Sequence, residues 1–119
     1  MHELSIASEI LKNTIISAQE NNAKKVQEIT LEVGKLLMIN PEQLTFCIEL
    51  ISKDTICDGM KIIIKILPAK VKCKNNHITV IDPKFSFLDI AKHLKCSCCD
   101  SEIEIIGGRE LIIKKIIAE

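Results

Sequence analysis

The stretch that decides the fold covers residues 26–52, VQEITLEVGKLLMINPEQLTFCIELIS. Its first third alternates apolar and polar side chains, which is typical of a half-exposed β-strand over residues 26–33. The apolar positions are Ile29, Leu31 and Val33. The polar positions are Glu28, Thr30 and Glu32. Gly34 should end this strand, because glycine weakens regular strand structure.

A helix should follow this strand after a loop over residues 35–39. Asn40 is a good N-cap, since its side-chain oxygen can accept a hydrogen bond from the first turn. Pro41 suits the first helical position, and Gln43 stands where a capping box has its third helical residue. The buried face of this helix should carry Leu44, Cys47, Ile48 and Ile51.

The flanking segments complete the domain. Residues 4–21 predict an amphipathic helix that ends at Asn21-Asn22. Its expected apolar stripe is Leu4, Ala7, Leu11, Ile15 and Ala18. A second strand over residues 60–67 should stop at Pro68, and a final strand over residues 111–117 should follow a glycine turn. This order indicates an α+β fold, with two helices packed on a small β-sheet.

Composition excludes several classes of protein. The chain has 119 residues, 47% of them hydrophobic, with 16 basic and 16 acidic side chains and a net charge of zero. That balance argues against a nucleic-acid partner, which selects a basic surface. No signal peptide is visible, and no apolar run approaches the roughly 20 residues of a membrane helix. We therefore expect a cytoplasmic protein with neither membrane nor nucleic acid as a partner.

The character of the sequence changes after Pro68. Residues 69–108 hold four of the six cysteines and two of the three histidines. The segment is poor in apolar mass, so a bound metal would have to supply part of its folding free energy. We therefore divide the chain into an α+β domain, residues 1–69 together with 109–119, and an inserted zinc-ribbon-like subdomain, residues 70–108.

Two short cysteine-containing knuckles in the insert suit a tetrahedral zinc ion. Each knuckle would place two donors on one side of the ion, and residues 78–95 would bring the pairs together. The preferred Zn(II) ligands are Cys73, His77, Cys96 and Cys99. The fourth ligand stays open, because a standard knuckle would have cysteine at position 76, where Asn76 stands. The competing candidates are His93 and Cys98.

The other thiols have plainer interpretations. Cys47 lies on the apolar stripe of the second helix and reads as a small core residue. Cys57, beside Asp58-Gly59, reads as a loop thiol without a role. His93, if it binds no zinc, reads as a solvated histidine.

The amino terminus offers a different kind of metal site. The terminal amine of Met1, the backbone nitrogen of His2 and its imidazole Nδ1 can chelate one ion in a plane. Ni(II) and Cu(II) are the common divalent ions that suit square-planar, nitrogen-rich sites. A fourth donor could come from the backbone or carboxylate of Glu3. A histidine near a terminus is usually only solvated, so spacing by itself is weak evidence.

Taken together, these residues resemble the HypA/HybF family of hydrogenase-maturation nickel chaperones. The resemblance covers essentially the whole chain. It rests on the order of four motifs: Met1-His2-Glu3 followed by LSIA, Glu32-Val33-Gly34, Pro41-Glu42-Gln43-Leu44 followed by Phe46-Cys47, and the two-knuckle insert before the last strand. Each motif is common, but their order and spacing together are specific.

The resemblance implies a nickel carrier with a structural zinc. Such proteins bind Ni(II) through the amino-terminal histidine and deliver it to the large subunit of [NiFe]-hydrogenase. They act with the GTPase HypB, and in some organisms with urease maturation proteins. On this chain the nickel donors would be Met1, His2 and Glu3. Asn40 matches a position that carries Asp in some relatives near the nickel, and an amide is a poorer anionic donor. The family's zinc clip has two CxxC pairs, from which Asn76 departs. His77 would then replace a thiolate, which should weaken the site or make it more acid-labile.

Other functions remain open from the residues alone. The main alternative is a zinc-ribbon module that binds a protein or a nucleic acid, which would leave the Met-His-Glu start unexplained. A thiol-redox protein using Cys96, Cys98 and Cys99 is a third, with Lys95 as thin electrostatic support. No nucleophile–base pair or phosphate loop is recognisable, so we expect no enzyme. The chain is expected to be a monomer or a weak homodimer.

Overall fold

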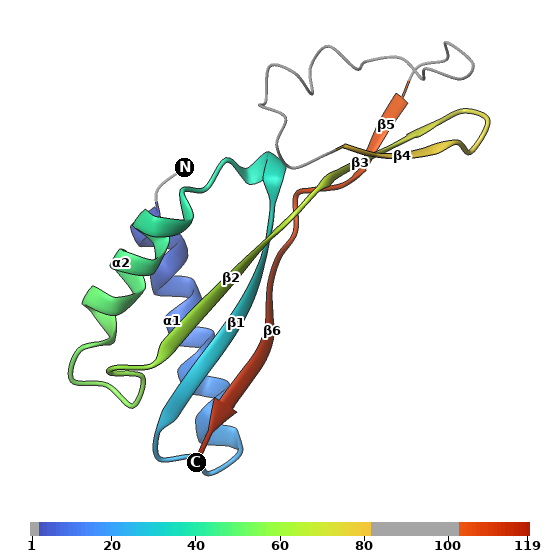
Figure 1. Ribbon diagram of the computed structural model, residues 1–119. Helices are drawn as coiled ribbons and strands as arrows, with labels where there is room; N and C mark the ends of the chain where they lie inside the picture. The colour runs from blue at the N-terminus through green and yellow to red at the C-terminus, as the bar shows by residue number, and fades with distance from the viewer. Residues whose placement is uncertain (1–2, 82–102) are drawn as a thin grey trace. The chain divides into compact units, whose positions relative to one another are not determined.

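The computed structural model describes residues 3–81 and 103–119. Its elements confirm the predicted α+β order (Figure 1). They are α1 (Glu3–Glu20), β1 (Val26–Gly34), the 3₁₀ turn η1 (Lys35–Leu37), α2 (Pro41–Ser52), β2 (Lys61–Leu67), β3 (Ala69–Cys73), β4 (Ile78–Ile81), β5 (Ile103–Gly107) and β6 (Leu111–Ala118). Within the described ranges, no helix has the length and apolar character needed to cross a membrane.

The strands form two three-stranded sheets, ordered β2-β1-β6 and β4-β3-β5. In the first sheet β1 and β2 run in the same direction, with α2 in the connection between them, and β6 runs the opposite way (Figure 1). Two neighbouring parallel strands need such a crossover connection, because a tight turn reverses the chain and would make the strands antiparallel. In the second sheet β3 pairs antiparallel with both β4 and β5.

The chain divides into two compact units. The first unit contains Met1–Glu32, Ile39–Lys65 and Leu111–Glu119, and the second contains Val33–Met38 and Ile66–Glu110. The second unit therefore includes the short segment around η1, which the sequence had grouped with the helices. The assignment of nickel to residues 1–69 together with 109–119, and of zinc to residues 70–108, stays a prediction.

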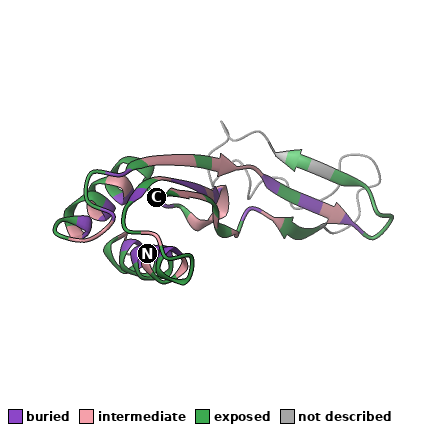
Figure 2. Ribbon diagram, turned by 90° about the horizontal axis from the view of Figure 1, so that it is seen from below, coloured by how far each residue is buried: buried purple, intermediate pink, exposed green. Residues whose placement is uncertain are grey.

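The core of the first unit lies between its helices and β1. Ile29 and Leu31 of β1 and Leu44 and Ile48 of α2 are all completely buried. α1 contributes Ala7, packs against α2 and also contacts β6. Figure 2 shows the buried positions along the helix faces and along β1. Aliphatic side chains at helical and strand spacing therefore build this core, as the periodicity predicts.

Two predicted helix faces are partly wrong. Leu4 is 53% exposed instead of buried, because the inner stripe of α1 is centred on Ile6, Ile10 and Thr14 as well as on the predicted Ala7 and Leu11. On α2, Cys47 and Ile51 are only half-buried. Ser52 is buried in their place and donates its hydroxyl to the carbonyl of Ile48, which satisfies the polar group.

The first strand is more buried than its alternating pattern predicts. Thr30 was expected on the exposed side, but only 8% of it is accessible. β1 is the middle strand of its sheet, so neighbours on both sides shield even its polar face. The neighbouring Glu28 and Glu32 reach Lys61 and Lys114 at 3.9 Å across that face. Because both lysines are largely exposed, these pairs add little stability.

The predicted helix ends are confirmed. At the end of α1, Asn22 adopts a positive φ of 57°, and the Ala23 N–H donates to the carbonyl of Ala18 at 2.9 Å. This is the hydrogen bond of a Schellman-type C-cap, and asparagine tolerates the left-handed conformation it needs. At the start of α2, Asn40 Oδ1 accepts from the Gln43 N–H at 3.1 Å, as an N-cap should.

Two glycines meet within the second unit. The Leu36 N–H donates to the carbonyl of Gly108 at 2.8 Å, and the Gly34 N–H donates to the carbonyl of Glu110 at 2.7 Å. A Cβ at Gly34 would overlap the backbone of Gly108, so only glycine allows this approach. Leu36 then packs on the buried cluster of Ala69 and Val71.

Candidate metal centres

The first candidate centre lies where α1 and α2 begin. Glu3 is in the first turn of α1, and its Oε1 accepts a hydrogen bond from the backbone N–H of Asn40 at 3.3 Å. Asn40 is the N-cap of α2, so the amino-terminal ends of both helices lie side by side (Figure 1). The structure thus brings together Glu3 and Asn40, which are 37 residues apart in the chain.

The electrostatics of this end favour a carboxylate. Backbone N–H groups without helical partners give each helix start a partial positive charge. Glu3 places its carboxylate against two such starts, and Glu42 adds a second acidic group in the first turn of α2. The side-chain oxygen of Asn40 is already engaged by the Gln43 N–H. The predicted donors Met1 and His2 lie outside the described residues.

The second candidate centre is the turn between β3 and β4. The Cys73 N–H donates to the carbonyl of His77 at 3.1 Å, and the Asn76 N–H donates to the carbonyl of Cys73 at 3.0 Å. Asn76 adopts a positive φ of 64°, which asparagine tolerates better than most residues. These hydrogen bonds close a tight turn in which Cys73 and His77 face each other across the hairpin.

The chemistry of this turn suits a metal ligand. The His77 N–H donates to the Sγ of Cys73 at 3.4 Å. A hydrogen bond to sulfur stabilises the thiolate, which is the form that binds zinc. Cys73 is buried and His77 is exposed. They supply two donors of the predicted set, and the other candidates, Cys96, Cys99, Cys98 and His93, lie outside the described residues.

The described ranges contain no complete ligand set. Within residues 3–81 and 103–119, no group of three or more His, Cys, Asp or Glu side chains could hold a metal ion. Glu3 is therefore only a part of the first candidate centre, and the Cys73–His77 turn is only a part of the second. The donors that would complete them belong to segments whose positions are not described.

Cys47 and Cys57 belong to neither centre. Cys57, expected to be a loop thiol, is completely buried, and this burial raises the pKa of its thiol, against a smaller lowering by the Thr55 hydroxyl. A raised thiol pKa suppresses the reactive thiolate. Cys57 is therefore a core residue of the loop between α2 and β2.

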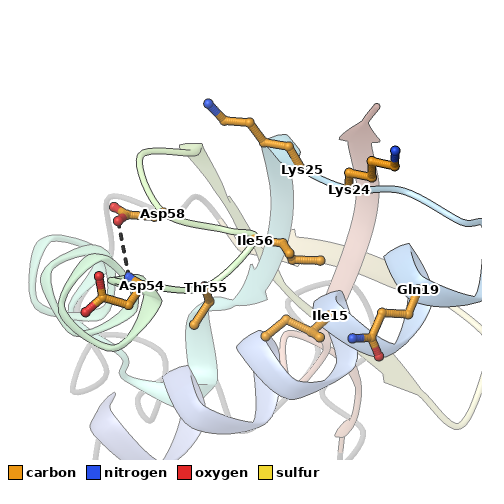
Figure 3. Close-up of a pocket in the computed structure, with 8 residues that line it drawn as sticks. All are labelled: Ile15, Gln19, Lys24, Lys25, Asp54, Thr55, Ile56 and Asp58. Atoms are coloured by element: carbon orange, nitrogen blue, oxygen red, sulfur yellow. Dashed lines mark hydrogen bonds between the residues drawn. The ribbon is translucent and has the colours of Figure 1, made fainter.

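The first unit also contains an open pocket of about 690 Å³ (Figure 3). Lys24 and Lys25 line it from the segment just before β1, and Asp54 and Asp58 line it from the loop after α2. Its eight lining residues include no histidine or cysteine and none of the predicted metal donors. The pocket therefore has no part in either candidate centre.

Sequence reasoning missed the outer side of α2. Phe46 is 62% exposed and Leu50 is 49% exposed, although both are large and apolar. The signal was present in the helical spacing. The two residues are one turn apart and lie opposite the buried pair Leu44 and Ile48.

Comparison with known proteins adds the family context. A family model described as "Hydrogenase/urease nickel incorporation, metallochaperone, hypA" matches residues 1–118. The hydrogenase maturation factor HypA of Methanosarcina acetivorans is 35% identical over 128 residues, which cover 100% of this chain and 96% of the relative. That of Methanothermobacter thermautotrophicus is also 35% identical, over 121 residues covering 100% and 98%.

Solved structures share the fold. The solution structure of the Ni metallochaperone HypA from Helicobacter pylori matches with a TM-score of 0.70, covering 99% of this chain and 97% of that one. A second solution structure of a HypA protein matches with a TM-score of 0.71. Sequence identity is 18% and 19%, so these two likenesses concern the fold alone.

Proposed function

The chain belongs to the HypA family of hydrogenase/urease nickel-incorporation metallochaperones, and from this premise we propose that it carries Ni(II) at its amino terminus. The donors are the Met1 amine, the backbone nitrogen and imidazole of His2, and Glu3. Nickel is cargo in this scheme and leaves with the receiving protein. The family consists of maturation factors rather than catalytic enzymes, so the relevant chemistry is ligand exchange.

The observation that carries the proposal is the contact between Glu3 and the start of α2. The Asn40 N–H holds one oxygen of the Glu3 carboxylate at 3.3 Å. This contact ties the first turn of α1 to the start of α2 and holds the carboxylate of one proposed donor. A chelating terminus gains affinity when its donors are held near the bound geometry, because less conformational entropy is lost on binding.

We propose that Asn40 has a structural role, although its position near Glu3 suggests a nickel ligand. Its Oδ1 accepts from the Gln43 N–H, and its own N–H holds Glu3. The two oxygens that could orient toward a cation, Oδ1 and the backbone carbonyl, accept from the N–H groups of Gln43 and Leu44 and are used for structure. In our proposal Asn40 positions Glu3 and caps α2, and it donates no electron pair to nickel.

We assign a structural zinc ion to the insert. Cys73 and His77 fit this ion, since the turn holds the cysteine sulfur within hydrogen-bond reach of the His77 backbone. Cys96 and Cys99 complete the set, and zinc would join the β3–β4 turn to the segment before β5. A Cys₃His set carries one thiolate fewer than a Cys₄ set, so acid should release this zinc more readily.

The proposed delivery of Ni(II) requires protein partners. We propose that the chain acts in the cytoplasm with a HypB-type GTPase and passes Ni(II) to the large subunit of [NiFe]-hydrogenase. The family description includes urease, so a urease accessory protein is a second recipient in an organism that has one. The alternative of a zinc-ribbon binding module without nickel gains nothing from the described residues.

The nickel proposal is tested by titration of Ni(II) into protein with an authentic amino terminus. We expect one equivalent to bind, and a version extended by a few residues before Met1 to lose this binding. His2→Ala should lose it as well, with an unchanged circular dichroism spectrum. Equal binding by the native and extended versions would rule out a terminal-amine site.

The zinc proposal is tested by metal content after purification. We expect about one equivalent of zinc, lost in Cys73→Ser and reduced in His77→Ala. His93→Ala and Cys98→Ser are the matched controls and should keep full zinc. Full zinc in His77→Ala together with loss in His93→Ala would transfer the fourth ligand to His93.

A further inference from the structure

The open pocket of the first unit has a rim that carries both signs of charge. Its lining residues are Ile15, Gln19, Lys24, Lys25, Asp54, Thr55, Ile56 and Asp58. Figure 3 shows both lysine side chains extending outward from the floor that Ile15 and Ile56 form, and the two carboxylates grouped together on one side of Ile56. The rim therefore has a basic half from the segment before β1 and an acidic half from the loop after α2.

Hydrogen bonds hold the two halves of the rim in place. The Val26 N–H donates to the carbonyl of Ile56 at 2.8 Å, which joins the segment with the lysines to the loop with the aspartates. Within that loop the Asp54 N–H donates to Oδ2 of Asp58 at 3.2 Å. A surface whose backbone is already ordered loses less conformational entropy when it binds a partner.

The four charged side chains of the rim form no ion pair within the described ranges. The ion pairs of those ranges are Lys61–Glu28 and Lys114–Glu32, and neither includes a lining residue of the pocket. The charged groups of the rim are all exposed: Lys24, Lys25, Asp54 and Asp58. Two positive and two negative groups are thus available to an outside partner.

The charged side chains next to the rim are also of both signs. Glu20 and Lys53 are the charged residues that adjoin lining residues in the chain. Glu119 exchanges two backbone hydrogen bonds with Lys25, at 3.3 and 2.9 Å, and its carboxylate accepts from the side chain of Gln27 in β1. A partner with only one sign of charge would therefore meet like charges over part of this surface, which disfavours binding.

The open rim does not suit a small ligand. Small-molecule sites bury roughly 70–90% of the surface of a drug-sized ligand. Five of the eight lining residues, Gln19 and the four charged residues, are themselves exposed. The surface of another protein is large enough to cover such a rim.

We propose that a second copy of this chain covers the pocket in a symmetric dimer. About a twofold axis, every contact from one copy to its partner is repeated in the opposite direction. Lys24 and Lys25 of one copy then lie against the partner's Asp54 and Asp58, and the reciprocal pairs form at the same time. A rim with both signs of charge is in this way complementary to itself, whereas an unrelated protein would need a matching arrangement of both signs.

This dimer leaves the Glu3 end of α1 uncovered. Ile15 of the pocket lies about 18 Å from Glu3 along the helix axis, at roughly 1.5 Å per residue. None of the proposed metal donors lines the pocket. The inference is therefore independent of the proposed function, and each dimer would present two separate amino termini.

Sedimentation of the purified full chain tests the proposal. We expect the unmodified protein to dimerise at about 50 mM salt and to dissociate toward about 500 mM, because salt screens exposed charges. Lys24→Glu/Lys25→Glu should weaken the dimer at least about tenfold, since acidic side chains would face the partner's aspartates. Lys70→Glu/Lys74→Glu is the matched control, because it makes the same change of charge at exposed positions of the second unit and should leave the dimer intact.

A charge swap between two copies tests the contact directly. Asp54→Lys/Asp58→Lys should also weaken self-association, but its equimolar mixture with Lys24→Glu/Lys25→Glu should form a heterodimer, because opposite charges then meet at both contacts. Both variants should keep the circular dichroism spectrum of the unmodified protein. If loss of the Asp58 carboxylate unfolds the loop, Asp54→Lys alone replaces that variant, since the loop hydrogen bond uses the backbone N–H of Asp54.

Several results would overturn the dimer. A chain that stays monomeric up to about 1 mM at low salt is one. Self-association that survives Lys24→Glu/Lys25→Glu, or that weakens equally in Lys70→Glu/Lys74→Glu, is another. A mixture of the two folded charge variants that forms no heterodimer is a third. Failure of the unmodified protein to bind Ni(II) would count against the proposed function alone, because sedimentation of the metal-free chain decides the dimer.

Discussion

At the start of α2, one residue has two structural roles. Asn40 closes the first turn through its Oδ1 and holds the Glu3 carboxylate through its backbone N–H. The cap satisfies one of the backbone donors that a helix start leaves without a partner. The Glu3 contact uses another donor at the same place. The geometry around the proposed nickel site thus depends on how α2 begins.

Removal of this cap should destabilise the protein measurably. We expect Asn40→Ala to lower the free energy of unfolding by about 1 kcal/mol in urea, because the Gln43 N–H loses its acceptor. Asn40→Asp should keep the stability, since a carboxylate caps as well. Asn13→Ala, at an exposed position inside α1, is the control and should cost nothing. Equal losses at positions 40 and 13 would show that the cap contributes no stability.

Cys57 provides a residue-scale test of burial. Because burial raises the pKa of its thiol, less thiolate is present at any pH, and iodoacetamide should label Cys57 far more slowly than the half-buried Cys47 at pH 8. Mass spectrometry of the two peptides measures the ratio. The raised pKa also means that the unfolded chain releases this proton first, so stability should fall as the pH rises above the ordinary thiol pKa of about 8.5. Equal labelling of the two thiols before unfolding would contradict the buried position.

At the scale of elements, glycine determines how β1 ends. Gly34 lies so close to the backbone of Gly108 that a single methyl group would have to displace main chain. The hydrogen bonds of Gly34 and Leu36 to the β5–β6 connection depend on this approach. Sequence reasoning used Gly34 only as the end of a strand, because the partner backbone lies far away in the chain.

Gly34→Ala should therefore be strongly destabilising, by about 3 kcal/mol, as for an overpacked site. Gly59→Ala is a useful comparison, since Gly59 has a positive φ of 76° but nothing within 4 Å of an added Cβ. Backbone strain alone should cost that variant about 1–2 kcal/mol. Urea unfolding of both variants measures the difference. A smaller loss at position 34 than at position 59 would refute the close packing.

At the scale of the whole molecule, the division into two units predicts a partial response to zinc removal. The first unit has its own core of Ile29, Leu31, Leu44 and Ile48, whereas the second has the small cluster of Ala69, Val71 and Leu36. A chelator should therefore remove amide-exchange protection from β3, β4 and β5 while α1 and α2 keep theirs. Added zinc should restore it. Simultaneous loss in both units would mean that they unfold as one.

The sequence alone predicted much of this fold, for reasons of local physics. Periodicity located the helices and the long strands, because apolar side chains must share one face of an element. Asn40-Pro41 and Asn21-Asn22 located helix ends, because capping depends on residues that are neighbours in the chain. The short strands β3, β4 and β5 were not predicted, although Ala69, Val71 and Cys73 alternate with two lysines in β3. Each strand is only four or five residues long, and β5 pairs with a strand distant in the chain.

What the sequence determined by itself is the set of chemical groups: a histidine and an acidic residue at the amino terminus, cysteines and histidines in two short knuckles, and the apolar periods that demand an α+β core. What only the tertiary structure decided is which of these groups meet. Glu3 and Asn40 contact each other, Thr30 and Cys57 are buried, and Leu4, Phe46 and Leu50 are exposed. The physical reason is that burial and long-range hydrogen bonds depend on neighbours supplied by other elements, which no local pattern records.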